Sequence, residues 1–188
     1  MRLHNKTILI LLLLLSVNMF ATGQKVKEEK PPVSERLFLG GSFGLQFGSI
    51  TYINISPVVG LWVLPRVAIA AGPSFIYYKF YDEKTSIYGG RFYNQYVVLQ
   101  DFNNIIPIGL HAGIFLHLED EVLALESDYW KNSINGSNRF IANNLLFGGG
   151  IKQQIGARSF LNLTALWKIH DSGYSIYSSP EIRVSFSF

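Results

Sequence analysis

His170, Asp171 and Ser172 bring together the three residue types of a hydrolase triad near the end of the chain. Such a triad needs a serine, a histidine base and an orienting carboxylate in one hydrogen-bonded row. Neighbouring residues on a strand point to opposite faces, so three consecutive positions form this row only where a loop folds back. We therefore predict that no catalytic residue lies here, and we keep a lipid-modifying enzyme as an alternative.

Other ionisable residues recur at even spacings. His111 and His117 are six residues apart, which on a strand places both on one face but about 20 Å from each other. That separation is too long for a shared metal ion, and we expect neither a metal nor a cofactor. Glu119 follows His117 by two residues and could pair with it. We predict a polar network that fills a narrow interior, made of His111, His117, Glu119, Lys152, Lys168 and Arg183.

The elements that hold these residues are strands, and the C-terminal one is the clearest. Over residues 182–188 the chain alternates between an apolar and a polar face, which is typical of a half-exposed strand. The apolar face consists of Ile182, Val184, Phe186 and Phe188. This ending resembles the C-terminal aromatic signal of bacterial outer-membrane β-barrels, which implies recognition by the barrel-assembly machinery of that membrane.

The first 23 residues have the features of an export signal. Basic residues precede an unbroken apolar run over residues 8–15, and small residues at Ala21 and Gly23 suit a signal peptidase. The run is shorter than the roughly 20 residues of a transmembrane helix. We predict cleavage after Gly23, which removes Arg2 and Lys6 and lowers the formal net charge from +3 to +1.

The composition favours a β protein embedded in a membrane. Hydrophobic residues make up 48% of the chain, whereas charged residues make up only 15%, below the roughly 25% of soluble domains. No apolar run beyond the signal is long enough for a membrane helix, so strands with one lipid-facing side are favoured. The charge pattern has no basic stripe that would suggest nucleic acid, and with no cysteine there is no disulfide framework.

Residues 24–36 are charged, contain two prolines and show no periodicity, which predicts a disordered periplasmic tail. Residues 37–188 are long enough for eight strands, because a tilted membrane strand needs about 9–11 residues besides its connection. The predicted strands cover residues 37–48, 52–63, 67–81, 91–102, a fifth from about 108, then 139–155, 160–170 and the C-terminal strand. In the second, Ile53, Ile55 and Val59 alternate with inward Asn54, Ser56, Gly60 and Trp62.

The connections predict which end is external. Those after the second, fourth and sixth strands read as short turns, whereas residues 82–90 and 128–138 read as longer polar loops. Short periplasmic turns and longer external loops are the usual asymmetry of such barrels. The fifth strand changes phase at Asp120, where Leu123 and Leu125 become the apolar set, which indicates a bulge or the point where the strand leaves the membrane. The alternation of the fourth strand is too poor to assign its faces.

Aromatic residues gather at the predicted strand ends. Such positions fit the girdles that mark the two membrane interfaces of a barrel, and a sugar- or peptide-binding rim is the alternative. The predicted interfacial set is Tyr77, Tyr81, Tyr129, Trp130, Tyr174 and Tyr177.

These features together predict an all-β fold, a closed antiparallel up-and-down eight-stranded transmembrane β-barrel. Closure follows because an unpaired backbone group costs several kcal/mol in lipid, so the last strand must meet the first. The alternative is a soluble β-sandwich, which leaves the low charge and the terminal Phe188 unexplained.

Residues 145–188 also resemble a known family. The segments Phe147-Gly-Gly-Gly-Ile, Leu166-Trp167 and Ser179-Pro-Glu-Ile-Arg-Val-Ser-Phe are similar to those of small outer-membrane barrel proteins of the Bacteroidetes. Residues 52–57 are similar to the second strand of that family. The resemblance implies the barrel fold and adds little about activity, and Ser185 stands where relatives often have glycine.

We therefore expect a non-enzymatic protein of the cell outer membrane, with a structural or surface-interaction role through its external loops. Its expected partners are outer-membrane lipid, lipopolysaccharide, the barrel-assembly machinery and an envelope or extracellular protein. The alternatives are an enzyme acting on lipid A, with its site near His170 or in the loop after the fifth strand, and a narrow small-solute channel. An interior of eight strands is filled by its own side chains, which disfavours the channel.

Overall fold

The computed structural model describes residues 31–46, 50–107, 109, 111–130, 138–170, 173, 176 and 180–188. The predicted signal 1–23 and residues 24–30 of the predicted tail lie outside this part of the chain. At the end of that tail Val33–Arg36 forms one helical turn, α2, where we predicted no regular structure. Within the described residues, no helix has the length and apolar character needed to cross a membrane.

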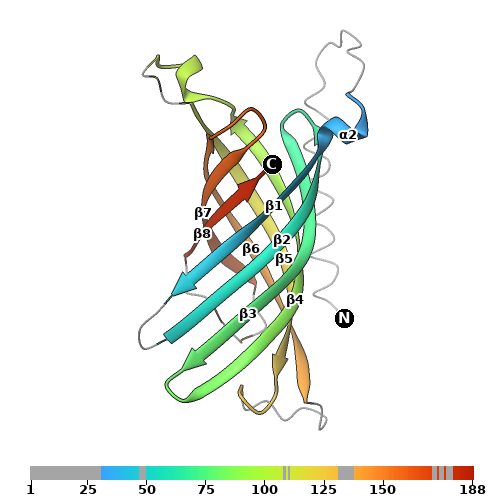
Figure 1. The fold of residues 1–188 in the computed structure, drawn as a ribbon, viewed down its shortest axis with the longest axis vertical. Helices are drawn as coiled ribbons and strands as arrows, with labels where there is room; N and C mark the ends of the chain where they lie inside the picture. The colour runs from blue at the N-terminus through green and yellow to red at the C-terminus, as the bar shows by residue number, and fades with distance from the viewer. Residues whose placement is uncertain are drawn as a thin grey trace. The chain divides into compact units, whose positions relative to one another are not determined.

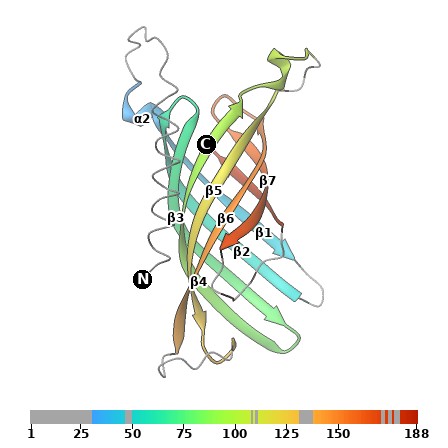
Figure 2. The same ribbon diagram turned by 180° about the vertical axis from the view of Figure 1, so that it is seen from behind.

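Eight antiparallel strands follow α2 and form a closed barrel in the order of the sequence (Figures 1 and 2). This confirms the predicted eight-stranded up-and-down barrel. The strands are β1 Leu37–Gln46, β2 Ile50–Leu64, β3 Val67–Phe80, β4 Glu83–Leu99, β5 Ala112–Glu126, β6 Arg139–Gln154, β7 Phe160–His170 and β8 Glu181–Ser187.

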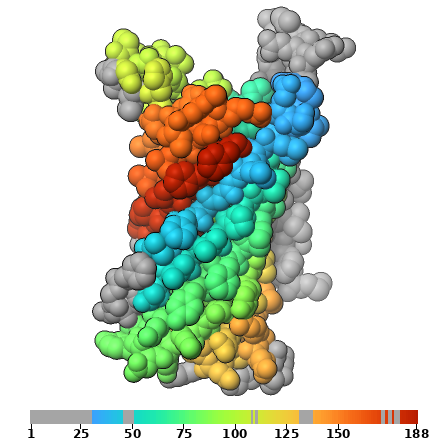
Figure 3. Space-filling view, in the orientation of Figure 1, coloured from blue at the N-terminus to red at the C-terminus, as the bar shows by residue number. Residues whose placement is uncertain are grey.

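The barrel is closed by β8, which lies between β7 and β1 (Figure 3). Four residue pairs join β1 to β8, from Gly40 opposite Ser187 to Phe43 opposite Val184. Beyond the strand itself, Phe188 N donates to Leu39 O at 2.7 Å and Leu39 N donates to Phe188 O at 3.1 Å. The chain's last residue is therefore part of the closing seam.

Apolar side chains cover the outside of the barrel. On β2 the exposed residues Ile55 and Val59 alternate with the buried residues Asn54 and Ser56, as the sequence predicts. The same holds for β8, where Ile182, Val184, Phe186 and Phe188 are all exposed. A water-soluble protein with so continuous an apolar exterior would be unusual, because such patches normally mark contact with a partner or with lipid.

The predicted polar loop at residues 82–90 is wrong. Strand β4 begins at Glu83, and β3 passes into β4 through a tight turn at Tyr81 and Asp82, with Tyr81 at a positive φ of 52°. All 14 residues of β3 pair with β4. The sequence hides this strand because apolar Ile87 and Val97 face inward together with Thr85, Arg91 and Gln95, so the inward face is not uniformly polar and the simple alternation of polar and apolar residues is lost.

The predicted asymmetry of the connections is also wrong in part. The β3–β4 turn, predicted to be long, is tight, and the connection after β4, predicted to be short, runs from residue 100 to 111. That connection contains a 3-10 helix, η1 Phe102–Asn104, whose N-cap Asp101 accepts a hydrogen bond from Asn103 N. It lies at the same end of the barrel as α2 (Figure 1). Strand β5 consequently starts at Ala112 rather than near residue 108.

No bulge occurs at Asp120. Strand β5 pairs without interruption through this residue, opposite Phe92 on β4 and Leu145 on β6, and Asp120 points outward. What changes is the interior, because the inward residues Glu119 and Glu121 are followed by inward Leu123 and Leu125. The apparent change of phase is a change from a polar to an apolar interior along one regular strand.

The far end of the interior is an apolar core, which we call the apolar plug. It consists of Ile76, Ile87, Leu123, Leu125 and Ala142, all fully buried. Tyr52, Trp130, Phe140 and Ile176 pack against it. Trp130 therefore belongs to this core rather than to an outward girdle as predicted, and Tyr129 stacks edge-on against Trp130 and Tyr78.

Gly148 on β6 allows two strands to approach closely, and we predict that Gly148→Ala destabilises the barrel. A Cβ at this position would lie 1.9 Å from Ala165 O on β7, a backbone atom that cannot turn aside. Overpacking of this kind costs about 1–3 kcal/mol. The matched control is Gly90→Ala on β4, whose Cβ would meet its nearest neighbour at 3.7 Å. Urea unfolding of the refolded protein measures both, and equal free energies of unfolding would contradict the prediction.

Candidate functional site

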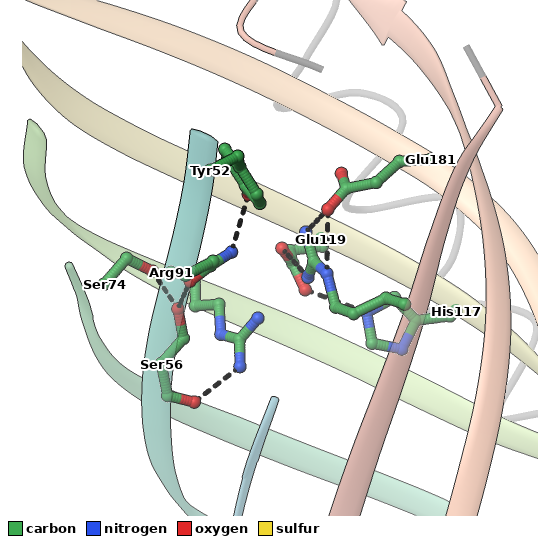
Figure 4. A network of polar contacts seen from close by, with 9 residues as sticks. Tyr52, Ser56, Ser74, Arg91, His117, Glu119 and Glu181 are labelled. Carbon is green, nitrogen blue, oxygen red and sulfur yellow. Dashed lines mark hydrogen bonds and ion pairs between the residues drawn. The ribbon is translucent and has the colours of Figure 1, made fainter. Parts of the chain in front are cut away.

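Four charged or ionisable side chains are in contact inside the barrel, and we call them the charged network: His117, Glu119, Glu181 and Arg183. Figure 4 shows the surroundings of His117, Glu119 and Glu181. Arg183 Nη1 lies 2.6 Å from Glu119 Oε1, and Arg183 Nη2 lies 2.9 Å from Glu181 Oε1. His117 Nε2 lies 3.0 Å from the other oxygen of Glu119. Glu119 thus binds two partners, one through each of its oxygens.

Strand alternation and the narrow barrel bring this network together. His117 and Glu119 are successive inward residues of β5, and Glu181 and Arg183 are successive inward residues of β8. The two strands do not pair with each other, so the Arg183–Glu119 contact crosses the interior. Burying these charges costs several kcal/mol for each ion, and mutual pairing with good geometry offsets that cost.

A second chain of hydrogen bonds runs beside the charged network (Figure 4). Arg91 Nη2 donates to Ser56 O at 2.7 Å, and Ser56 Oγ donates to Asn54 Oδ1 at 2.6 Å. Asn54 Nδ2 then donates to Tyr52 Oη at 3.0 Å, and Ser74 Oγ lies 3.1 Å from Ser56 Oγ. These groups link β2, β3 and β4 on their inner faces, so the polar part of the interior involves most of the ring of strands.

A cavity of about 250 Å³, which we call the vestibule, lies on the side of the charged network away from the apolar plug. His117, Glu119 and Arg183 line its inner end, and Glu35, Arg158 and Phe188 line its mouth at the end of the barrel that carries α2. A second cavity, of about 290 Å³, shares Trp62, Lys152 and Phe160 with it and is lined also by Asp101 and His111. The interior is therefore hollow at the end that carries α2 and filled at the opposite end.

Lys152 lies between these two cavities, held between two aromatic rings. Its Nζ is 4.4 Å from the centroid of Trp62 on β2 and 3.8 Å from that of Phe160 on β7. Such cation–π contacts contribute about 0.5–2 kcal/mol each, depending on desolvation. The sequence predicts inward positions for both Trp62 and Lys152, but their contact depends on the spatial order of β2, β6 and β7, which periodicity does not reveal.

The six residues of the predicted polar network do not all lie together in the structure. His117, Glu119 and Arg183 are in contact, Lys168 is a half-buried inward residue of β7, and Lys152 lies at the vestibule. His111 is wrong as a member of the inner network, because it precedes β5 and is exposed. Its Nδ1 donates to Asp101 Oδ2 at 2.8 Å, and this hydrogen bond lowers the pKa of the Asp101 carboxyl by favouring its charged form.

The predicted group of His170, Asp171 and Ser172 is described only in part. His170 is an exposed residue at the end of β7, and Asp171 and Ser172 lie outside the described residues. Of the predicted interfacial aromatics, Tyr77 is half-buried on β3 and Tyr81 is exposed in the β3–β4 turn. Tyr174 and Tyr177 also lie outside the described part.

Sequence reasoning missed several interior residues. Arg91, Tyr93 and Gln95 are successive inward residues of β4, the strand whose faces the sequence does not assign, and Tyr93 stacks on His117 with ring centroids 4.6 Å apart. Glu181 is absent from the predicted polar network because the predicted alternation begins at Ile182. Extending the same period by one residue would have placed Glu181 on the face of Arg183.

The part of the chain that the structure describes contains no group of three His, Asp or Glu residues arranged to hold a metal ion. No protein-family model matches this chain, and no curated protein matches it in sequence.

Arg183 neutralises two buried carboxylates, so we predict that Arg183→Met strongly destabilises the barrel. Glu119 and Glu181 would remain buried without their shared cation, and breaking a buried pair in this way costs about 3–5 kcal/mol. The control is Arg66→Met, which removes an exposed guanidinium that, among the described residues, donates to Val98 O at the long distance of 3.4 Å. Urea titrations of the two variants should differ clearly in midpoint, and an unchanged midpoint for Arg183→Met would contradict the role of this residue.

Proposed function

We propose that this protein is a non-enzymatic integral barrel of the bacterial outer membrane that presents a rigid external surface to envelope partners. The observation that carries the proposal is the continuous apolar exterior of a closed barrel with a charged interior. This is the inverse of a soluble protein's arrangement and suits lipid outside and water inside. The export signal, the C-terminal aromatic residues and the resemblance to small barrels of the Bacteroidetes support the same compartment.

Strand length supports a membrane span with an external extension. The 14 residues of β3 make a strand about 46 Å long at a rise of about 3.3 Å per residue. At a tilt of about 40° this strand rises about 35 Å, whereas the apolar band of such barrels is about 25 Å tall. About 10 Å of the barrel would stand outside the membrane.

The extension belongs at the end opposite α2 and Phe188, where the apolar plug lies. The plug gives this part of the barrel a core of its own, and packing against it holds the adjoining parts of β3, β4, β5 and β6 in place. Exposed aromatic residues lie along the β3–β4 hairpin and in its turn, including Phe75 against Tyr88 and Phe80 against Tyr81. A rigid surface rich in aromatic residues is suited to contact with lipopolysaccharide or with a protein of the envelope.

The same plug argues against a role as a channel. A continuous water path would have to pass five fully buried apolar side chains and the paired charges beneath them. Small eight-stranded barrels leave an interior that side chains can fill. We therefore propose a barrel that does not conduct.

We predict that Leu116→Arg prevents stable insertion into lipid. Leu116 is exposed near the middle of the outer face of β5, between Ile114 and Leu118, and an arginine at mid-bilayer costs about 2–4 kcal/mol in a barrel. The control is Ile155→Arg, which changes an exposed residue of the β6–β7 turn. Folding into lipid vesicles, followed by the shift in electrophoretic mobility of unheated samples, measures both. Equal folding yields would overturn the proposed membrane span.

We predict that planar-bilayer recordings of the folded protein show no steady unitary current, because the plug closes one end of the interior. A general porin recorded in the same bilayers serves as the positive control. Reproducible unitary steps that depend on the amount of added protein would show that the interior conducts, and would favour the channel over the structural role.

A further inference from the structure

The β3–β4 hairpin presents two lysines directly opposite each other on its outer face. Lys79 of β3 pairs in register with Lys84 of β4. Each is three residues from a strand position that faces the apolar plug, Ile76 on β3 and Ile87 on β4, so strand alternation turns both lysines outward. They lie near the tip of the hairpin, at the end of the barrel opposite α2 (Figure 1).

The two lysines carry positive charge that their neighbours do not balance. Side chains directly opposite each other on a sheet have Cβ atoms about 4.5–5.5 Å apart, and like charges in such a pair destabilise the sheet. Among the described residues, neither lysine makes an ion pair or a hydrogen bond. Asp82 lies in the turn, and Glu83 pairs with Phe80 on the other face of the hairpin. An anion held between the two ammonium groups would relieve their repulsion.

A third cation, Arg139 of β6, lies over the same face. Its Cζ is 4.9 Å from the centroid of the Tyr88 ring, and its Nη1 donates to Ser86 O at 2.9 Å. Ser86 precedes Tyr88 by two residues and follows Lys84 by two, which is about 7 Å along the strand. Glu126 is opposite Arg139 in register and brings one carboxylate to this side. The three cations therefore exceed the neighbouring carboxylate by two charges.

The height of the lysines along the barrel matches the level of lipid phosphates. Strand β3 begins at Val67, directly after the exposed turn residue Arg66, so its membrane span starts near there. Lys79 is 12 residues further on, about 40 Å along the strand and about 30 Å along the axis at a tilt of about 40°. The apolar band of such barrels is about 25 Å tall. Lys79 is thus about 5 Å beyond the band, in the headgroup layer, and Tyr77 is at its edge.

We propose that Lys79 and Lys84 form a binding site for a phosphate group on the headgroup of an outer-leaflet lipid of the lipid A type. The phosphate lies between the two ammonium groups, and Arg139 adds to the positive field around it. The acyl chains of the same lipid lie against Tyr77 and the exposed Phe75, closer to the middle of the barrel. The inference rests on the proposed function, because it requires this face of the hairpin to contact lipid.

Thermal unfolding of the folded barrel in uncharged detergent micelles, with increasing amounts of diphosphorylated lipid A, tests the site. A lipid that binds the folded barrel raises its unfolding midpoint, and the loss of the electrophoretic mobility shift on heating measures that midpoint. We expect a saturable rise with diphosphorylated lipid A and a much smaller rise with lipid A from which both phosphates have been removed. Equal rises with the two lipids, or no rise with either, would overturn the proposal.

The double variant Lys79→Gln/Lys84→Gln should change sign between the two conditions. Without lipid A its midpoint should exceed that of the unaltered protein, because the repulsion between the lysines is gone. With diphosphorylated lipid A its apparent affinity should be about 10- to 100-fold weaker, because two cations near an anionic headgroup are lost. An unchanged affinity would refute the site.

The matched control is Arg66→Gln/Arg158→Gln, which removes two exposed positive charges from turns at the other end of the barrel. It changes the net charge by the same amount and should bind diphosphorylated lipid A as the unaltered protein does. An equal loss of affinity in both double variants would show a general effect of charge and would also refute the site.

These outcomes are separable from a failure of the proposed function, because the measurement in micelles does not require insertion into a bilayer. Normal folding of Leu116→Arg into vesicles would remove the membrane assignment, whatever the lipid A result. Equal binding of phosphorylated and dephosphorylated lipid A would remove the phosphate site and leave the membrane barrel as proposed.

Discussion

Backbone pairing between β1 and β8 is the interaction on which the rest of this structure depends, because it turns a sheet with two open edges into a ring. The seam is short, four residue pairs and the reciprocal bonds of Leu39 and Phe188. Once it forms, every inward side chain faces others across a narrow space. That geometry brings Arg183 of β8 within 2.6 Å of Glu119 on β5, although 64 residues separate them in sequence.

The closed ring divides its interior along the axis. Charged groups occupy the middle, where Arg183 lies between two carboxylates, and a change to inward leucines at Leu123 makes the far end a packed apolar core. The near end stays hollow because its large side chains, Trp62 and Phe160, lie around the mouth beside Lys152. Stability and a cavity are thus provided by different parts of the same barrel.

The sequence predicted the fold wherever polar and apolar residues alternate. Strand β7 was predicted with the bounds that the structure has, and the outward faces of β2 and β8 were also correct. Prediction failed at β4 and beyond Asp120 on β5, because there the interior itself is partly apolar and alternation no longer separates the two faces. A hydrophobicity pattern depends on the contrast between the inward and the outward face of a strand. Where both faces are partly apolar, the pattern no longer shows which residues point inward.

The candidate site was predictable as a set of inward polar residues but not as an arrangement. Contacts such as Lys152 with Trp62 and Phe160 depend on which strands face one another across the ring, and that follows from closure and register rather than from local spacing. His111 shows the converse, since its even spacing from His117 suggested a shared interior face. The late start of β5 leaves His111 outside, bonded to Asp101. The position of a strand's first residue therefore decides whether a polar side chain belongs to the interior or to a turn.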